Sequence, residues 1–173
     1  GWCAFGYQFN DGTGTCELVT GLMAVENLPH TLVGYWPLNG DATDIGPNAL
    51  HGDAINAEWV TGVAGQAFFL SGDDTVRVVE HGTTALDVSN ILMLAWIMPT
   101  NFDVAADRGI IMNKESTYEF GLQDNTGALQ GALAPGCWRW WGTAVVSTNV
   151  WTWVGAGVDG SNEKHFINGA FAE

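Results

Sequence analysis

Residues 136–142, GCWRWWG, surround one arginine with three tryptophans, in a chain that has only five lysines and arginines. If this stretch is a strand, Trp138 and Trp140 share one face, and Arg139 and Trp141 share the other. Because Trp is usually mostly buried, we predict that the first pair belongs to the core. Arg139 beside Trp141 then forms a ring with a flanking fork of donors, a surface that suits a sugar. The alternative is a surface cation over a ring, which is worth about 0.5–1 kcal/mol and binds nothing.

Acidic side chains gather in three predicted loops. Two lie between Asn39 and Asn48, two follow Gly72, and one precedes Gly160. Calcium takes about six to eight oxygens, commonly from loop carboxylates and backbone carbonyls, so these loops indicate a cation site. Turn geometry alone is the alternative reason for Asp and Asn at such positions. The candidate ligands are Asp41, Asp44, Asp73, Asp74 and Asp159.

The chain has three cysteines. Cys3 and Cys16 flank a short polar loop, and they could pair as a disulfide in an oxidising compartment. Cys137 is then left over. Two alternatives stay open for it: a buried free thiol, or a bond to a cysteine beyond Glu173 or on another molecule.

Charge and hydropathy exclude several kinds of partner. The 19 Asp and Glu outnumber the five Lys and Arg, and the net charge is −14. Nucleic acid needs cationic side chains to neutralise its phosphates, so it is a poor partner, and an anionic membrane surface is disfavoured on the same grounds. No apolar run approaches the roughly 18–20 residues that would span a bilayer.

The 23 glycines and nine tryptophans indicate β structure with many tight turns. Short apolar runs recur with Gly, Asn or Asp between them, and no helical stripe stands out. The predicted fold class is therefore all-β, an antiparallel β-sandwich or jelly roll. Strands are expected near residues 32–38, 66–71, 75–80, 91–98, 109–112, 117–122, 128–133, 137–146, 151–158 and 164–167.

The first residues are predicted to form a separate hairpin. Aromatic side chains alternate over residues 5–9 and lead into Asn10-Asp11-Gly12, a strong turn signal. We expect a disulfide-linked hairpin within residues 1–23, a linker at 24–31, and one sandwich domain at 32–173.

Several motifs follow one another along residues 32–173. Tyr35-Trp36 precedes an N-G-rich loop, an N-x-x-H-G step at 48–52 and a G-x-x-G-x-A approach at 62–67. LMLAWIMPT (92–100), YEFGLQDNTGALQ (118–130) and the strand pair of 150–172 with its Asn-Gly turn come next. In this order they resemble the laminin G-like, concanavalin A-like jelly-roll family.

The resemblance implies a jelly roll that binds ligands at a surface, and in many members a calcium ion at the loop rim. Two features depart from the family pattern. Its domains usually continue with further strands after the Asn-Gly turn, so we expect an open sheet edge or a fragment of a longer chain. Met98 also stands where the family has a cation. Residues 1–23 more weakly resemble the last part of an apple/PAN module, through C-A-F-x-Y and C-E-L.

No catalytic signature is present. The family's glycanase relatives carry two carboxylates spaced as E-x-D-x-E or E-x-D-x-x-E, and neither spacing occurs. The four histidines lie in no zinc-binding spacing, and the chain has no G-x-S-x-G elbow and no P-loop. We therefore expect a non-enzyme.

The function that we predict is an extracellular, lectin-like adhesion module that binds a carbohydrate or glycoprotein. Calcium is the expected cofactor, at the loop carboxylates, and Trp141 with Arg139 is the expected ligand site. The alternative is a structural subunit of an extracellular assembly such as a matrix, coat or surface filament, with neighbouring subunits as partners. An unpaired Cys137 and an open sheet edge favour this alternative.

Overall fold

The computed structural model describes residues 7–10, 15–18, 32–56, 58–71, 75–78, 82–103, 108–133, 139–159 and 162–173. Every regular element among them is a β-strand, and every pairing is antiparallel, which confirms the predicted all-β class. The chain divides into two compact units, one formed by Leu28–Asp87 and the other including Val88–Glu173. This boundary falls inside the range expected to be a single sandwich, and each unit is described by itself.

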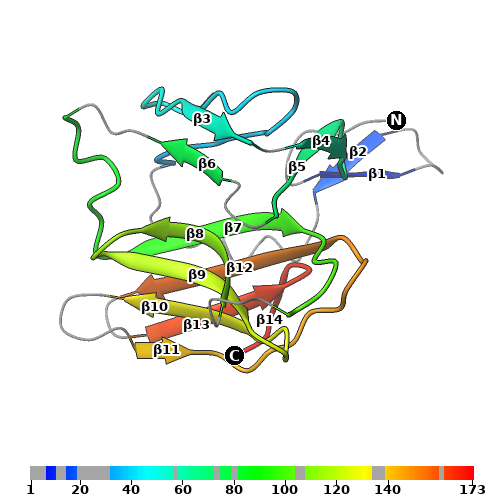
Figure 1. Ribbon diagram of the computed structural model, residues 1–173, viewed down its shortest axis with the longest axis vertical. Helices are drawn as coiled ribbons and strands as arrows, with labels where there is room; N and C mark the ends of the chain where they lie inside the picture. The colour runs from blue at the N-terminus through cyan, green and yellow to red at the C-terminus, as the bar shows by residue number, and fades with distance from the viewer. Residues whose placement is uncertain are drawn as a thin grey trace. The chain divides into compact units, whose positions relative to one another are not determined.

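The unit from Val88 onward is a sandwich of two four-stranded sheets (Figure 1). One sheet has the order β11-β10-β9-β8 and the other the order β14-β13-β12-β7. The strands of the first sheet are β8 (Arg108–Lys114), β9 (Tyr118–Gln123), β10 (Leu129–Leu133) and β11 (Arg139–Trp141). Those of the second are β7 (Ile91–Ile97), β12 (Thr152–Asp159), β13 (Asn162–Ile167) and β14 (Ala170–Phe171).

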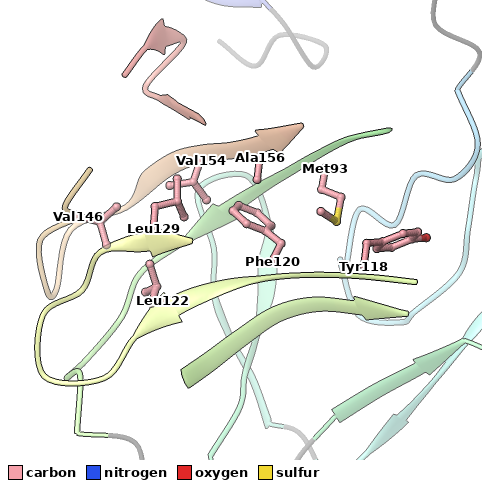
Figure 2. Packing of buried hydrophobic residues seen from close by; sticks show 8 residues of the cluster. All are labelled: Met93, Tyr118, Phe120, Leu122, Leu129, Val146, Val154 and Ala156. Atoms are coloured by element: carbon pink, nitrogen blue, oxygen red, sulfur yellow. The ribbon is translucent and has the colours of Figure 1, made fainter. Parts of the chain in front are cut away.

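The core of this unit lies between the two sheets (Figure 2). Alternate residues of each strand point inward, because successive side chains of a strand lie on opposite faces. Phe120, Leu129 and Val154 are fully buried. The whole cluster consists of Met93, Tyr118, Phe120, Leu122, Leu129, Val146, Val154 and Ala156.

The Leu28–Asp87 unit consists of two strand pairs and a long irregular loop. β3 (Gly52–Ile55) pairs with β6 (Thr75–Val78), and β4 (Glu58–Thr61) pairs with β5 (Gln66–Phe69). The predicted strand at 32–38 is wrong, because that segment is irregular. The backbone of this segment forms hydrogen bonds with side chains of the following loop instead of with a neighbouring strand. The Tyr35 N–H donates to the Asp44 carboxylate, and the Val33 carbonyl accepts from the Asn48 amide.

The predicted hairpin at the start of the chain is confirmed as a strand pair, β1 (Tyr7–Asn10) with β2 (Thr15–Leu18). The predicted strand at 137–146 is too long, since β11 ends at Trp141. Gly142 follows with a φ of 119°, and a Cβ there would lie 2.2 Å from both the His165 ring and the Leu129 carbonyl. Regular pairing is therefore interrupted at Gly142, and the chain meets the same neighbour again at the isolated bridge between Ala128 and Val145. Sequence patterns also missed β3, β4 and β14, which are strands of two to four residues.

Candidate functional site

Trp141 points into the sandwich, which reverses the predicted faces of the tryptophan strand. It pairs with Gly131, and a Cβ on that glycine would lie 2.7 Å from the Trp141 ring. The ring packs against the core cluster and stacks on His165, with the ring centroids 4.2 Å apart. Gly131 on the neighbouring strand thus makes room for this ring on the inner face. Alternation within the tryptophan strand alone does not show which of its faces has that room. Trp140 consequently lies on the outer face.

The outer face of the β8–β11 sheet carries polar side chains and one indole. Asn113 pairs with Glu119, Glu119 with Ala132, and Ala132 with Trp140, so the four form one row across the four strands. The Asn113 amide donates to the Glu119 carboxylate. We call the outward side chains of this sheet the polar face. Its described polar and aromatic members are Asn113, Glu119, Gln123, Gln130 and Trp140; Ile110 and Ala132 also face outward, and Arg108 occupies an outward position opposite Gln123.

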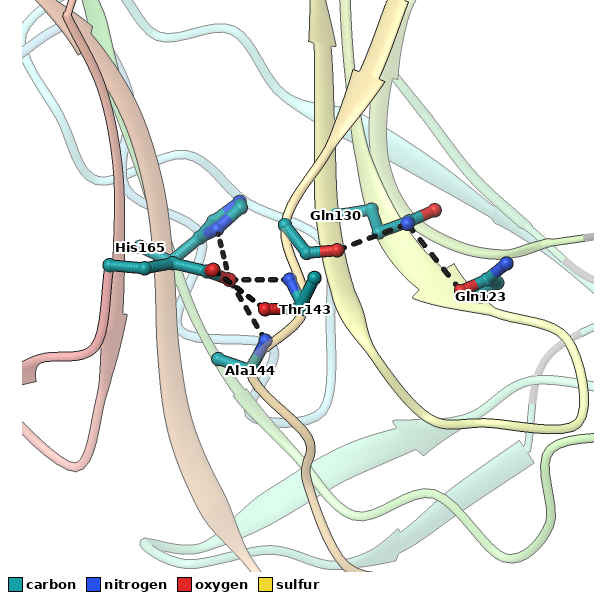
Figure 3. Close-up of polar contacts among 7 residues, drawn as sticks. Gln123, Gln130, Thr143, Ala144 and His165 are labelled. Atoms are coloured by element: carbon teal, nitrogen blue, oxygen red, sulfur yellow. Dashed lines mark hydrogen bonds and ion pairs between the residues drawn. The ribbon is translucent and has the colours of Figure 1, made fainter.

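The two glutamines of the polar face bond each other and neighbouring groups (Figure 3). Gln130 Nε2 donates to the carbonyl of Gly142 at 3.1 Å and to Gln123 Oε1 at 3.5 Å. The Thr126 hydroxyl also donates to Gln123 Oε1. Both amide hydrogens of Gln130 are therefore engaged, and its buried Oε1 has no hydrogen-bond partner in the described part of the chain.

A second polar group joins the ends of the two sheets (Figure 3). The Glu173 carboxylate accepts hydrogen bonds from the backbone N–H of Thr143, from its hydroxyl at 2.8 Å, and from the N–H of Ala144 at 2.8 Å. The backbone carbonyl of Glu173 accepts from the N–H of His165. These bonds, led by the backbone bond from Thr143, lower the pKa of Glu173 to about 2. We call this group the Glu173 clasp.

His165 completes the clasp from the interior. Its side chain is fully buried, and Nδ1 lies 3.4 Å from Glu173 Oε1. Burial lowers the pKa of His165, although Glu173 opposes the shift, so the imidazole is neutral at pH 7. Nδ1 carries the hydrogen, because a carboxylate at this pH only accepts. Among the described residues, His165 Nε2 and the Nε1 of the stacked Trp141 find no hydrogen-bond partner.

Asp44 organises its own loop. One carboxylate oxygen accepts from the N–H groups of Tyr35 at 2.7 Å and Gly46 at 2.6 Å, and the other accepts from Leu50 at 2.8 Å. Burial raises the pKa of Asp44, but these backbone bonds outweigh it, and the net pKa is below the ordinary value. Asp44, 3% exposed, thus directs its carboxylate to the backbone.

The other predicted calcium ligands are distributed differently. Asp41 is exposed and accepts the N–H of Thr43, which lowers its pKa. Asp159 ends β12 opposite Asn162, and its side chain lies outside the described residues. Asp73 and Asp74 also lie outside them. Within the described ranges, no three His, Cys, Asp or Glu side chains are grouped so as to hold a metal ion.

Several other predicted groups fall outside the described part of the chain. These are Cys3, Cys137 and Trp138, together with the side chains of Cys16 and Arg139. The disulfide therefore stays a prediction, as does the Arg139 contact with a ligand. The register does confirm that Arg139 and Trp141 share a face of β11, because their partners are Leu133 and Gly131. In the described ranges, no helix could cross a membrane.

Comparison with known proteins gives one structural likeness. No protein-family model and no curated protein sequence matches the chain. Among solved structures, it is similar to "Domain 4 of AbnA, a GH43 extracellular arabinanase from Geobacillus stearothermophilus, in complex with arabinotriose". The identity is 20% and the TM-score 0.48, over 80% of this chain and 71% of that chain.

Sequence reasoning missed the polar face. Its members are spread over 28 positions, from Asn113 to Trp140, and no local motif joins them. The available signal was alternation, because Tyr118, Phe120 and Leu122 are apolar while Glu119 and Gln123, at alternate positions, are polar. Only the strand order and register bring Glu119 and Trp140 into one row.

Proposed function

We propose that this protein is an extracellular carbohydrate-binding module of the laminin G-like type, and that it holds neutral glycans on the polar face. The observation that carries the proposal is the row Asn113–Glu119–Ala132–Trp140. A sugar ring presents hydroxyls at its edge and C–H groups on its faces. Amide and carboxylate groups suit the hydroxyls, and an indole suits the apolar faces.

The spacing of this row supports the proposal. Neighbouring strands lie about 4.8 Å apart, so the backbone positions of Glu119 and Trp140, two strands apart, are separated by roughly 10 Å. The small side chain of Ala132 stands between them. Ala132 is only 1% exposed, so a ligand would contact the carboxylate and the aromatic ring on either side of it.

The charge of the molecule favours neutral glycans over acidic ones. Among the described side chains of the polar face, Glu119 is the one that carries a charge, and the chain carries a net charge of −14. Arg108 occupies one outward position of this sheet, opposite Gln123, but a single cation leaves the field of the molecule negative, so sulfated sugars and uronic acids would be repelled. Hydroxyl groups meet no such penalty, and they can donate to the carboxylate.

A glycan array with neutral and acidic sugars, probed once in calcium and once in chelator, tests this proposal. We expect neutral glycans to bind. The calcium requirement inferred from the loop carboxylates predicts that binding is lost in chelator, whereas a polar face that acts alone predicts that binding survives. An array without any bound glycan would contradict the carbohydrate proposal.

Replacing Trp140 by alanine tests the location of the site. We expect Trp140→Ala to weaken binding of the best neutral oligosaccharide by roughly tenfold or more, because a central aromatic contact is lost. Isothermal titration calorimetry with a free oligosaccharide measures this without avidity. Trp96→Ala is the matched control, because Trp96 lies on the outer face of the other sheet and is 46% exposed. Equal loss in both variants, or none in Trp140→Ala, would contradict the polar face as the site.

A further inference from the structure

The four edge strands of the sandwich differ in how well they are protected. An open edge attracts other strands, and proteins guard edges with short strands, charges or bulges. β11 has three residues and β14 has two. β8 carries Arg108 and Lys114 at its ends and a bulge between Ile110 and Met112. β7 is the exception: it has seven residues, ILMLAWI, without a charge, a proline or a register shift.

The uncharged character extends beyond β7 itself. Residues 88–102 contain no charged side chain, although the chain as a whole carries 24 charged residues besides histidine. β7 pairs with β12 on one side, and within the described ranges no strand pairs with it on the other. In the part of the chain that the structure describes, β7 is therefore a long, neutral edge without these protecting features, on a strongly acidic molecule.

The pairing geometry identifies which backbone groups of β7 point to this edge. Trp153 exchanges hydrogen bonds with Asn168, on the β13 side of β12, so its backbone groups point away from β7. Antiparallel ladders alternate, so Val154 and Ala156 are the β12 residues that bond to β7. Their partners are Ala95 and Met93. The N–H and C=O groups of the intervening residues point to the open edge. These residues are Leu92, Leu94 and Trp96.

We propose that β7 pairs antiparallel with β7 of a second copy of this chain, which joins two four-stranded sheets into one continuous sheet. The twofold axis lies at Leu94, the middle residue of the strand. Leu94 then opposes Leu94 of the second copy, and Leu92 opposes Trp96 of the second copy. All of these residues direct their backbone groups to the open edge, so every pair can exchange two hydrogen bonds.

A second copy suits this edge better than an unrelated strand for two reasons on the molecule. The register is self-complementary in size, because Met93 opposes Ala95 and an aliphatic side chain opposes Trp96. The edge is also neutral. Each molecule has a charge of −14, but residues 88–102, which would lie closest to the second copy, contain no carboxylate. The remaining long-range repulsion is screened by salt, so association should strengthen as ionic strength rises.

Sedimentation equilibrium of the 173-residue chain tests the pairing, over about 1–200 µM and at low and high salt. The expected result is a reversible dimer that tightens with salt. A chain that stays monomeric over this range overturns the proposal. So does a chain that associates only with a strand of another protein, because the occupant would then not be a second copy.

Leu94→Pro distinguishes edge pairing from contact between apolar side chains. Proline removes the N–H that points to the open edge and leaves the bonds of Met93 and Ala95 to β12 in place. Leu94→Ala is the control, because it shortens the same side chain and keeps the N–H. We expect the dimer dissociation constant to rise by roughly tenfold or more in Leu94→Pro and by less than about threefold in Leu94→Ala. Equal effects in the two variants, or none in Leu94→Pro, overturn edge pairing.

Hydrogen exchange of the unmodified chain gives a test that needs no substitution. The amides of Met93 and Ala95 bond to β12 and should be protected at every concentration. Those of Leu92, Leu94 and Trp96 should become protected only where the dimer forms. If the protection of these three amides does not change with concentration, the proposal is overturned even if Leu94→Pro fails to fold.

Discussion

At the scale of single residues, close approach decides where two side chains can lie. Gly131 makes room for Trp141 on the inner face, and Gly142 makes room for His165. Neither glycine lies in a strong turn signal, so their roles in packing could not be predicted from the sequence. The stretch GCWRWWG is therefore divided by its neighbours: Trp141 belongs to the interior, and Trp140 belongs to the polar face.

Gly142→Ala tests this packing. We expect a loss of about 2–4 kcal/mol in the free energy of unfolding, because a methyl group would meet the Leu129 carbonyl and a fully buried ring. Gly82→Ala is the matched control. Gly82 also has a positive φ, 83°, but nothing lies within 4 Å of its added Cβ. Urea unfolding should show a loss of about 1 kcal/mol for the control, from backbone strain alone. Similar losses in the two variants would contradict steric contact as the cause.

Asp44→Ala is predicted to destabilise the Leu28–Asp87 unit by about 1–3 kcal/mol. The substitution leaves the N–H groups of Tyr35, Gly46 and Leu50 without their acceptor. Hydrogen exchange at those three amides and urea unfolding followed by Trp fluorescence measure the effect. Asp41→Ala is the control, because exposed Asp41 accepts one backbone N–H, that of Thr43, among the described residues. Unchanged exchange at the three amides would show that Asp44 does not organise the loop.

At the scale of elements, the Glu173 clasp makes the stability of the sandwich depend on pH. The folded pKa of Glu173 is about 2, below its ordinary value of 4.5, so its contribution is fully present above pH 4.5 and disappears as the pH falls toward 2. The folded pKa of His165 is also lowered, so below pH 6.5 protons bind the unfolded chain preferentially. Both groups therefore lower the free energy of unfolding in acid.

Glu173→Gln isolates the contribution of the carboxylate. We expect the variant to be about 1–2 kcal/mol less stable than the parent chain at pH 7, since hydrogen bonds to a charged acceptor are weakened in a partly exposed site. The deficit should shrink between pH 4.5 and about 2. Urea midpoints at pH 7, 5 and 3 measure it, with Glu115→Gln in the exposed turn after β8 as the control. A deficit that is constant with pH would assign the effect to shape instead of charge.

At the scale of the whole molecule, alternation within strands was predictable and the relation between strands was not. The predicted strands 91–98, 117–122 and 151–158 closely match β7, β9 and β12, because apolar or alternating runs between turn signals favour a strand. Segment 32–38 is equally apolar, yet side chains from 44–48 occupy its backbone groups. Such bonds join residues about ten positions apart, and no pattern within the segment reports them.

The same limit explains the candidate sites. Asp41 and Asp44 are close in sequence and were predicted to share one role, but one is exposed while the other bonds the backbone of three residues. The polar face needs four strands in register before Asn113 and Trp140 belong to one surface. The proposed function depends on this register, which only the assembled sheet reveals.

The pairing of β7 with β12 also has a consequence for how the chain folds in time. β8 to β11 form a run of neighbouring strands, and β12 to β14 form another, so both can assemble from local contacts. β7 must instead find a strand that lies 55 to 67 positions further along, from Ile97–Thr152 to Ile91–Val158. Closing so long a loop is slow compared with forming a hairpin. During synthesis, the most apolar strand of the sandwich thus emerges well before its partner and stays unpaired with β12 until that strand has been made.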